Sequence, residues 1–291
     1  MIEILMKLLK FLVLLVFSMC LCACPNRTSN GGEAVNSTYD RVIEDGKIRV
    51  GYIHYPPGFS RDPNTGKFSG IMHDVLVESC RNLQIEVEFV EEVGWGTMIE
   101  SLKSGRVDLV CTGLWPNAAR GRLVDFSLPV YYSPVKAYAK AGDVRFDGNL
   151  SSANNSEVKI SVIDGEMTSI IAEFDFPEAE VAGLPQTSDV SQVLLELSTG
   201  KVDITFVEPA IANEFLSKNP NSIREVADVG ALRVFPNVFM VDKGESKLVT
   251  TINTAIDELA NTGYIDKIVS RYEKREGELW RKSLPYESFI E

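Results

Sequence analysis

The chain has 291 residues, with 29 Lys and Arg side chains against 41 Asp and Glu, so its net charge at pH 7 is −12. An acidic balance spread without long runs argues against nucleic acid or an anionic membrane face as a partner and is typical of a secreted protein. His54 and His73 are the only histidines, and no Cys, Asp or Glu grouping has metal-ligand spacing, so we expect no metal and no cofactor.

Residues 1–23 have the pattern of a lipoprotein signal peptide. Lys7 and Lys10 precede an apolar core of about 13 residues, which is too short to span a membrane. Leu21-Cys22-Ala23-Cys24 then resembles the lipobox of bacterial lipoproteins, with Cys24 as the lipidated residue. A plain secretory signal is the alternative. Residues 24–44 are polar after Cys24 and are expected to form a flexible tether.

The rest of the chain is long enough for two lobes with separate cores, and its hydrophobic patterns predict alternating strands and helices. For the first lobe we expect, in chain order, a strand at Lys47–Tyr52, a helix at Met72–Asn82, a strand at Ile85–Val90, a helix from Thr97 to Gly105 that opens with a capping box, a strand at Val107–Leu114 and an extended crossing to Lys140. For the second lobe we expect a strand at Glu157–Ile163, a helix from Gly165, a short strand at Val181–Gly183, a helix at Ser188–Thr199 capped by Ser188 or Asp189, a strand at Val202–Glu208 and a return crossing at Val234–Asp242. Helices at Leu248–Asn261 and Tyr264–Tyr272 follow.

Two stretches of the chain nearly repeat one another, Leu102–Leu109 (LKSGRVDL) and Leu197–Ile204 (LSTGKVDI). In each, a helical pattern ends at a glycine, which adopts the left-handed cap conformation without a Cβ penalty, and a buried strand begins. The repetition predicts two similarly built α/β lobes. Ligands of open α/β sheets bind beyond the carboxyl ends of the strands, which fall here at Gly113 and Glu208. We therefore expect these two positions to face one cleft.

Only Cys80 and Cys111 would remain after removal of the signal peptide. Two cysteines do not make a disulfide framework, and Cys111 lies inside an apolar strand pattern. Two free, buried thiols are therefore favoured over a bridge between them.

From about Asp45 to Tyr272 the chain resembles the bacterial solute-binding proteins of the polar amino-acid uptake family, which have the type II periplasmic binding fold. The residues that carry the resemblance are Gly51, Pro56-Pro57, Phe59, Gly66, Gly70, Asp74, Trp95, Arg120 ahead of Asp125-Phe126-Ser127, the Val202-Asp203 unit, Leu259 and the Gly263 to Tyr272 helix. The resemblance implies an α/β fold of two lobes, each a mostly parallel sheet flanked by helices, joined by two crossover strands and closing over a solute by hinge motion. It places lobe 1 at 45–133 and 237–275, lobe 2 at 134–236 and a C-terminal tail at 276–291.

The same resemblance implies roles for individual side chains. Arg120 matches the arginine that holds the α-carboxylate of an amino acid, and Glu208 matches the acidic residue that holds its α-amino group. Trp95 and Tyr55 match the aromatic residues on opposite sides of the ligand.

Some positions depart from the family pattern. Trp115 stands where a Ser or Thr is usual, which leaves the Gly113 backbone N–H as a donor to the carboxylate. Gly165-Glu166-Met167 replaces Gly-Ser/Thr-Thr, with Thr168 following at a helix N-terminus, a natural anion site. The acidic residues of binders of basic amino acids match Ile53 and Met72, so lysine and arginine are disfavoured as ligands.

The function that the resemblance implies is an extracytoplasmic receptor, periplasmic or lipid-anchored to the cell membrane, that captures a small amino-acid-like solute for an ABC permease. We expect a monomer that touches the membrane only through its anchor and is not an enzyme. Two alternatives stay open. One is an enzyme on the same fold, similar to the cyclohexadienyl dehydratases, with Glu208 as a buried general acid. The other is a ligand-sensing partner of a membrane receptor.

Overall fold

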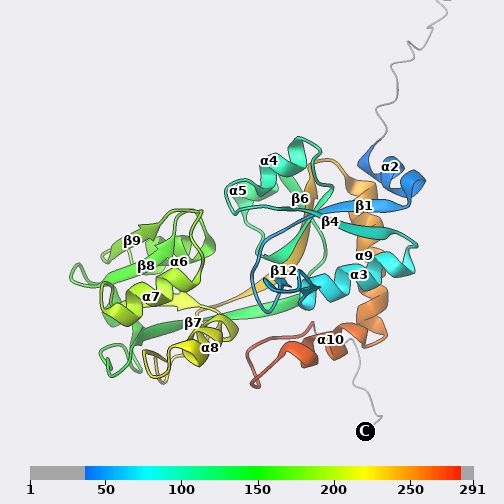
Figure 1. The fold of residues 1–291 in the computed structure, drawn as a ribbon. Helices are drawn as coiled ribbons and strands as arrows, with labels where there is room; N and C mark the ends of the chain where they lie inside the picture. The colour runs from blue at the N-terminus through cyan, green and yellow to red at the C-terminus, as the bar shows by residue number, and fades with distance from the viewer. Residues whose placement is uncertain (1–36, 283–291) are drawn as a thin grey trace, which may run out of the picture. The chain divides into compact units, whose positions relative to one another are not determined.

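The computed structural model describes residues 37–282 and shows a mixed α/β fold with helices on both faces of a largely parallel sheet (Figure 1). The predicted signal peptide, the lipidation site at Cys24, residues 24–36 of the predicted tether and residues 283–291 lie outside the described part of the chain.

The sheet runs in the order β4-β1-β5-β12-β7-β10-β8-β9, with β6 added on β12 and β11 added on β7. Its first-lobe strands are β1 (Lys47–Tyr52), β4 (Glu86–Glu92), β5 (Leu109–Leu114) and β6 (Val124–Phe126). A separate small hairpin joins β2 (Ser60–Arg61) to β3 (Phe68–Ser69). All six residues of β5 are buried, as expected of a strand covered by helices on both faces.

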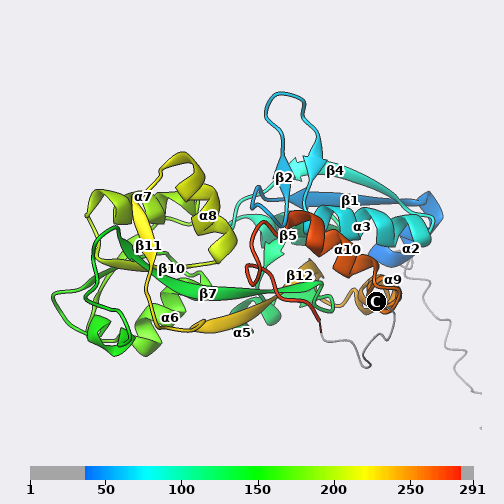
Figure 2. The same ribbon diagram turned by 90° about the horizontal axis from the view of Figure 1, so that it is seen from below.

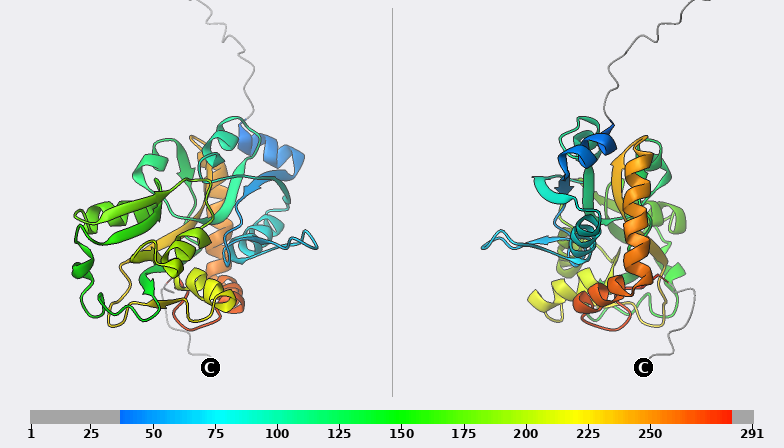
Figure 3. Two further views of the ribbon diagram at one scale, coloured as in Figure 1. Left: turned by 60° about the vertical axis from the view of Figure 1, so that its left-hand side comes forward. Right: turned by 90° about the vertical axis from the view of Figure 1, so that its right-hand side faces the viewer.

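Helices pack on both faces of the first-lobe strands. The helices are α2 (Thr38–Asp45), α3 (Ile71–Asn82), α4 (Met98–Lys103), α5 (Ala118–Gly121), α9 (Ser246–Asn261) and α10 (Tyr264–Tyr272). The buried side chains of α3, α9 and α10 share one core cluster with β1, whereas those of α4 join a second cluster with β5 and β12. Figure 3 shows α9 as the long orange helix of this lobe.

The second lobe repeats this plan. It contains β8 (Lys159–Ile163), β9 (Glu180–Leu184), β10 (Ile204–Val207) and β11 (Ile223–Glu225), with helices α6 (Met167–Asp175), α7 (Ser191–Thr199) and α8 (Pro209–Lys218) and the 3-10 turn η1 (Leu150–Ala153). Buried residues of α6 form one core cluster with β8 and β10, and those of α7 and α8 form another. The second lobe therefore has its own core.

Two long strands connect the lobes, β7 (Tyr131–Lys140) and β12 (Arg233–Asp242) (Figure 2). They pair antiparallel, from Tyr131 opposite Asn237 to Val135 opposite Arg233. Beyond this stretch β12 continues along β5, and β7 continues along β10. Both lobes therefore share the two crossover strands.

The strands and helices predicted from hydrophobic periodicity are present, with ends that differ by a few residues. The glycine caps of the repeat are also confirmed, since φ is +67° at Gly105 and +76° at Gly200. Cys80 and Cys111 are free and buried, as expected.

Three local predictions were wrong. The N-cap of α7 is Val190 rather than Ser188 or Asp189, although Asp189 Oδ1 accepts from the Ser191 N–H at 2.8 Å. Residues 37–44 of the predicted tether belong to the cap and helix of α2, because Ser37 accepts from the Asp40 N–H and Val42 is fully buried in the first-lobe core. The capping box at Thr97 does not form, because the Thr97 hydroxyl accepts from the Gly94 N–H instead.

Within residues 37–282, no helix is long and apolar enough to cross a membrane. The same residues contain no cluster of His, Cys, Asp and Glu side chains that could hold a metal ion.

Candidate functional site

A pocket of about 50 Å³ lies between the two lobes, at the carboxyl ends of their parallel strands. Its lining residues are Tyr55, Trp95, Gly113, Trp115, Ile163, Glu166, Thr168, Val190, Val193, Phe206 and Val207.

Aromatic rings form the first-lobe side of the pocket. Tyr55 and Trp95 meet edge to face, with ring centroids 5.5 Å apart. Trp115 follows β5 and stacks on Phe235 of the crossover strand β12, with centroids 4.6 Å apart. Offset and edge-to-face pairs of this kind fix the rings in place, and their faces attract cations.

Gly113 lets an aromatic ring lie directly on the backbone of β5. A Cβ at this position would come within 2.9 Å of Tyr55 Cδ1 and 3.1 Å of Asn237 Oδ1. Real Cβ atoms do not tolerate the shorter of these distances, so any other residue here would push Tyr55 out of place.

Glu208 is the buried acidic group next to the pocket. It follows β10 directly, serves as the N-cap of α8, and is 2 % exposed. Burial raises the pKa of its carboxyl to about 7, although Ser133, Tyr55 and Trp115 lie near enough to oppose part of that rise. Among residues 37–282, no group forms a hydrogen bond with Glu208 Oε1 or with the ring N–H of Trp115.

Two further buried polar atoms lie beside this carboxylate. Asn237 donates through Nδ2 to the Ser133 hydroxyl at 2.7 Å, which joins the two crossover strands. In the described part of the chain, Asn237 Oδ1 and the Tyr131 hydroxyl have no partner. Buried polar atoms are rarely left unpaired, so a cluster of them around a carboxylate indicates a place for a polar ligand or water.

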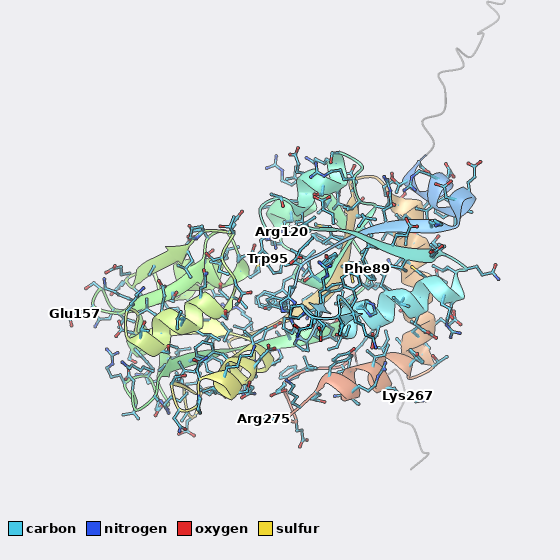
Figure 4. The ribbon with its side chains drawn as sticks, in the orientation of Figure 1. Phe89, Trp95, Arg120, Glu157, Lys267 and Arg275 are labelled. Carbon is cyan, nitrogen blue, oxygen red and sulfur yellow. The ribbon has the colours of Figure 1, made fainter. Side chains whose placement is uncertain are left out.

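Arg120 comes from the short helix α5, where the Asn117 side chain accepts from its backbone N–H at 2.8 Å. It lies on the same side of the first lobe as Trp95 (Figure 4). Its guanidinium reaches the second lobe, where Nη2 donates to Glu166 Oε1 at 2.5 Å. The Arg120 side chain is 9 % exposed and that of Glu166 is 16 % exposed. The pair therefore forms a largely buried ion pair between the lobes.

Glu166 is the N-cap of α6 and follows a glycine in the left-handed conformation. Gly165 has φ of +72°, and a Cβ on it would lie 2.6 Å from Gln186 Nε2. Burial raises the pKa of Glu166, although the positive charge of Arg120 acts in the opposite direction. Thr168, two residues later, lines the pocket from the first turn of α6.

The structure thus brings the predicted site residues together, although their roles in binding stay predictions. Tyr55, Trp95, Gly113, Trp115 and Thr168 line the pocket. Glu208 and Arg120 do not line it: Glu208 follows the lining residue Val207 in the chain, and Arg120 pairs with the lining residue Glu166.

Sequence reasoning missed six lining residues. Ile163 and Val207 end parallel strands, so the rule that placed Gly113 would also have found them. Glu166 was noticed as a departure but not assigned to the site. Val190, Val193 and Phe206 carry no signal beyond ordinary core periodicity.

Residues 48–275 match the family model of the bacterial extracellular solute-binding proteins, family 3. A probable histidine-binding protein of Campylobacter jejuni is 26% identical over 257 residues, which cover 87% of this chain and 93% of that protein. A putative ABC transporter arginine-binding protein of Escherichia coli K12 is 24% identical, over 75% of this chain and 86% of that protein.

Among solved structures, an ancestral amino-acid-binding protein that is a precursor of cyclohexadienyl dehydratase superposes with a TM-score of 0.71 at 23% identity, over 82% of this chain and 100% of that chain. At this identity the likeness supports the two-lobed fold. The family match spans both lobes and the crossover strands, and the chain belongs to the bacterial extracellular solute-binding proteins, family 3.

Proposed function

We propose that this family member binds a small solute with a cationic amine in the pocket between its lobes and delivers it to an ABC permease. The solute's ammonium group would lie against Glu208, and its apolar part would lie among the rings of Tyr55, Trp95 and Trp115. Solute contacts with both lobes would favour the closed conformation, which a permease could then recognise.

The observation that carries this proposal is the buried carboxyl of Glu208 beside an aromatic pocket, since no group in residues 37–282 forms a hydrogen bond with its Oε1 and no cation there pairs with it. An isolated carboxylate is costly to bury, and a cation that pairs with it removes that cost. Aromatic faces add to the attraction for an ammonium group.

A thermal-shift panel of L-amino acids and small amines tests the proposal. A solute that binds only the folded protein, present at about 100 times its Kd, should raise the melting temperature by roughly 5 °C or more. Glu208→Gln should abolish the shift, because the amide has no charge to offer. Glu178→Gln, the same change at an exposed position, is the matched control. A panel without any stabilising solute, or a shift that survives in Glu208→Gln, would contradict the proposal.

We further propose that lysine and arginine are not the solute. The positions that would hold a basic side chain are occupied by Ile53 and Met72, which are 7 % and 0 % exposed and offer no charge. The Escherichia coli relative is named for arginine binding, so both amino acids belong in the panel. A shift with either one as large as the best in the panel would overturn this exclusion.

We also propose that Cys24 carries a lipid that anchors the protein to the membrane. The lobe boundaries would lie at 133/134 and 236/237. The protein would act as a monomer. Incorporation of labelled palmitate that disappears in Cys24→Ser would support the anchor, whereas unchanged incorporation would exclude Cys24. Light scattering of the purified protein measures the number of copies.

One observation favours catalysis as a second candidate function. The Glu208 carboxyl, with a pKa of about 7, holds a proton near neutrality as a general acid must. Incubation with prephenate or arogenate, followed by absorbance of the aromatic product, separates the two candidates. We expect no product, and turnover that disappears in Glu208→Gln would establish the enzyme instead.

A further inference from the structure

We propose that Glu166 occupies Arg120 in place of a ligand carboxylate, so that the pocket selects amines without a carboxylate over the corresponding amino acids. This inference rests on the proposed function and narrows its solute to one chemical class.

Both terminal nitrogens of the Arg120 guanidinium already have partners. Nη2 donates to Glu166 Oε1 at 2.5 Å, and Nη1 approaches the Trp115 carbonyl oxygen at 3.5 Å. A ligand carboxylate could pair with this guanidinium only by displacing Glu166 or by lying beside it. Displacement leaves the largely buried Glu166 without its cation, and adjacency places two negative charges together.

The net charge around the pocket also favours an amine over an amino acid. The charges of Arg120 and Glu166 cancel, whereas no cation in residues 37–282 pairs with Glu208, which is a carboxylate above its pKa of about 7. A zwitterionic amino acid adds no net charge and would leave the pocket negative. A monocation neutralises it, so burial of the ligand is less costly.

The remaining lining explains what else the amine should carry. Ile163, Val193 and Phe206 present apolar side chains to the pocket from the second lobe. This lining favours an alkyl or aryl group over a polar one. The class is therefore a small primary amine with an apolar body.

Glu166 differs from an ordinary surface ion-pair partner in its placement. It lines the pocket itself, and its side chain extends from the N-cap of α6 across to the other lobe. The pair is thus formed only when the lobes are together, which is also when a solute is enclosed.

The experiment compares two matched pairs of probes, isoamylamine against L-leucine and phenethylamine against L-phenylalanine, by calorimetry at pH 8. At this pH the Glu208 carboxyl is ionised, because its pKa is about 7. At least one amine should bind the unmodified chain at least about tenfold more tightly than its amino acid does. A tenfold difference in affinity is the effect of one charge-assisted hydrogen bond.

Glu166→Gln removes the negative charge that pairs with Arg120. The affinity of each amino acid relative to its amine should therefore rise by about tenfold or more, which reverses the preference. Glu173→Gln, an exposed glutamate on the same helix, should leave the ratio unchanged. The melting temperature of each variant is measured first, and the ratio in the unmodified chain tests the inference even where Glu166→Gln does not fold.

Two results would overturn the inference: amino acids that bind the unmodified chain as well as their amines do, or a ratio that Glu166→Gln does not change. Both leave the proposed function standing, since a solute still binds. Failure of all four probes to bind the unmodified chain and Glu166→Gln would count against the inference and the proposed function together.

Discussion

Asp108 and Asp203 occupy the same place in the two repeated stretches and make the same contacts in the two lobes. The Asp108 backbone N–H donates to the Arg49 carbonyl at 2.8 Å, and Asp108 Oδ2 accepts from the Arg49 N–H at 2.8 Å. Asp203 forms the same two bonds with Lys159, each at 2.9 Å. In both lobes, the aspartate after the capping glycine therefore fixes the register of the opening strand.

Asp108→Asn should destabilise the fold more than Asp203→Asn does. The Asp108 side chain is 2% exposed and pairs with Arg41 and Arg49, whereas that of Asp203 is 25% exposed. Loss of the buried charge removes an ion pair from both arginines and leaves Arg41 with only Asp45, and we expect a cost of about 2 kcal/mol. The more exposed site should cost about 1 kcal/mol or less. Urea unfolding of the two variants checks the order, and an equal or larger loss at Asp203 would contradict it.

The repeat explains why so much of the fold could be predicted from the sequence. A glycine after a helical pattern and a β-branched run after the glycine are local signals, and both lobes use them. Helix α8 went unpredicted although Pro209 begins it and Ile211, Ala212 and Phe215 supply its buried face. Helix α2 is polar, and its stability depends on one buried valine and on contacts distant in sequence.

The site could be predicted only where it follows from strand ends or from the family pattern. Gly113 and Glu208 were placed by the carboxyl-end rule, and Trp95 by the resemblance. The pairing of Arg120 with Glu166 could not be predicted, because it depends on how closely two lobes approach. No local pattern encodes that distance.

Glu278→Ala should destabilise the protein and loosen the connection between the lobes. Glu278 is 4 % exposed and accepts from Asn213 Nδ2 on α8 of the second lobe at 2.5 Å, while Arg275 donates to Asn213 Oδ1 at 2.6 Å. Arg275 lies in the segment that follows α10 of the first lobe (Figure 4). We expect a loss of about 2 kcal/mol in urea unfolding, together with faster hydrogen exchange in α8.

Glu276→Ala is the control for this segment, because Glu276 is exposed on the same stretch. It should leave both the unfolding midpoint and the exchange rates of α8 unchanged. Equal effects of the two substitutions would contradict the prediction, because stability and exchange in α8 would then depend on the segment as a whole rather than on the Glu278 contact.

Cys80 and Cys111 should resist alkylation in the folded protein. Burial raises the pKa of Cys80 to about 12 and that of Cys111 well above its usual value. Since the thiolate is the reactive form, iodoacetamide at pH 8 should label neither residue until denaturant is added. Mass spectrometry of the two peptides reads each site separately. Rapid labelling under native conditions would contradict the burial, and no labelling after denaturation without a reductant would contradict the free thiols.

The stability of the protein should fall as the pH rises from about 4.5 to 7, because of Glu208. Its pKa is about 7 in the folded protein against an ordinary value of 4.5, so the folded state binds a proton that the unfolded state has already lost. Unfolding then releases a proton, and the difference of about 2.5 units corresponds to about 3 kcal/mol across that range. Stability from the protonated carboxyl is present below pH 4.5 and is lost as the pH reaches 7.

Glu208→Gln removes this titration, so the difference in unfolding free energy between the variant and the original chain isolates it from the other carboxyl groups. That difference should shift in favour of the variant by about 2.5 kcal/mol between pH 5 and pH 8. Urea unfolding at four pH values in this range measures it, with Glu173→Gln as an exposed control. Parallel pH profiles for Glu208→Gln and the original chain would mean that the carboxyl keeps an ordinary pKa. Its burial beside the pocket would then carry no electrostatic cost for a cationic solute to relieve.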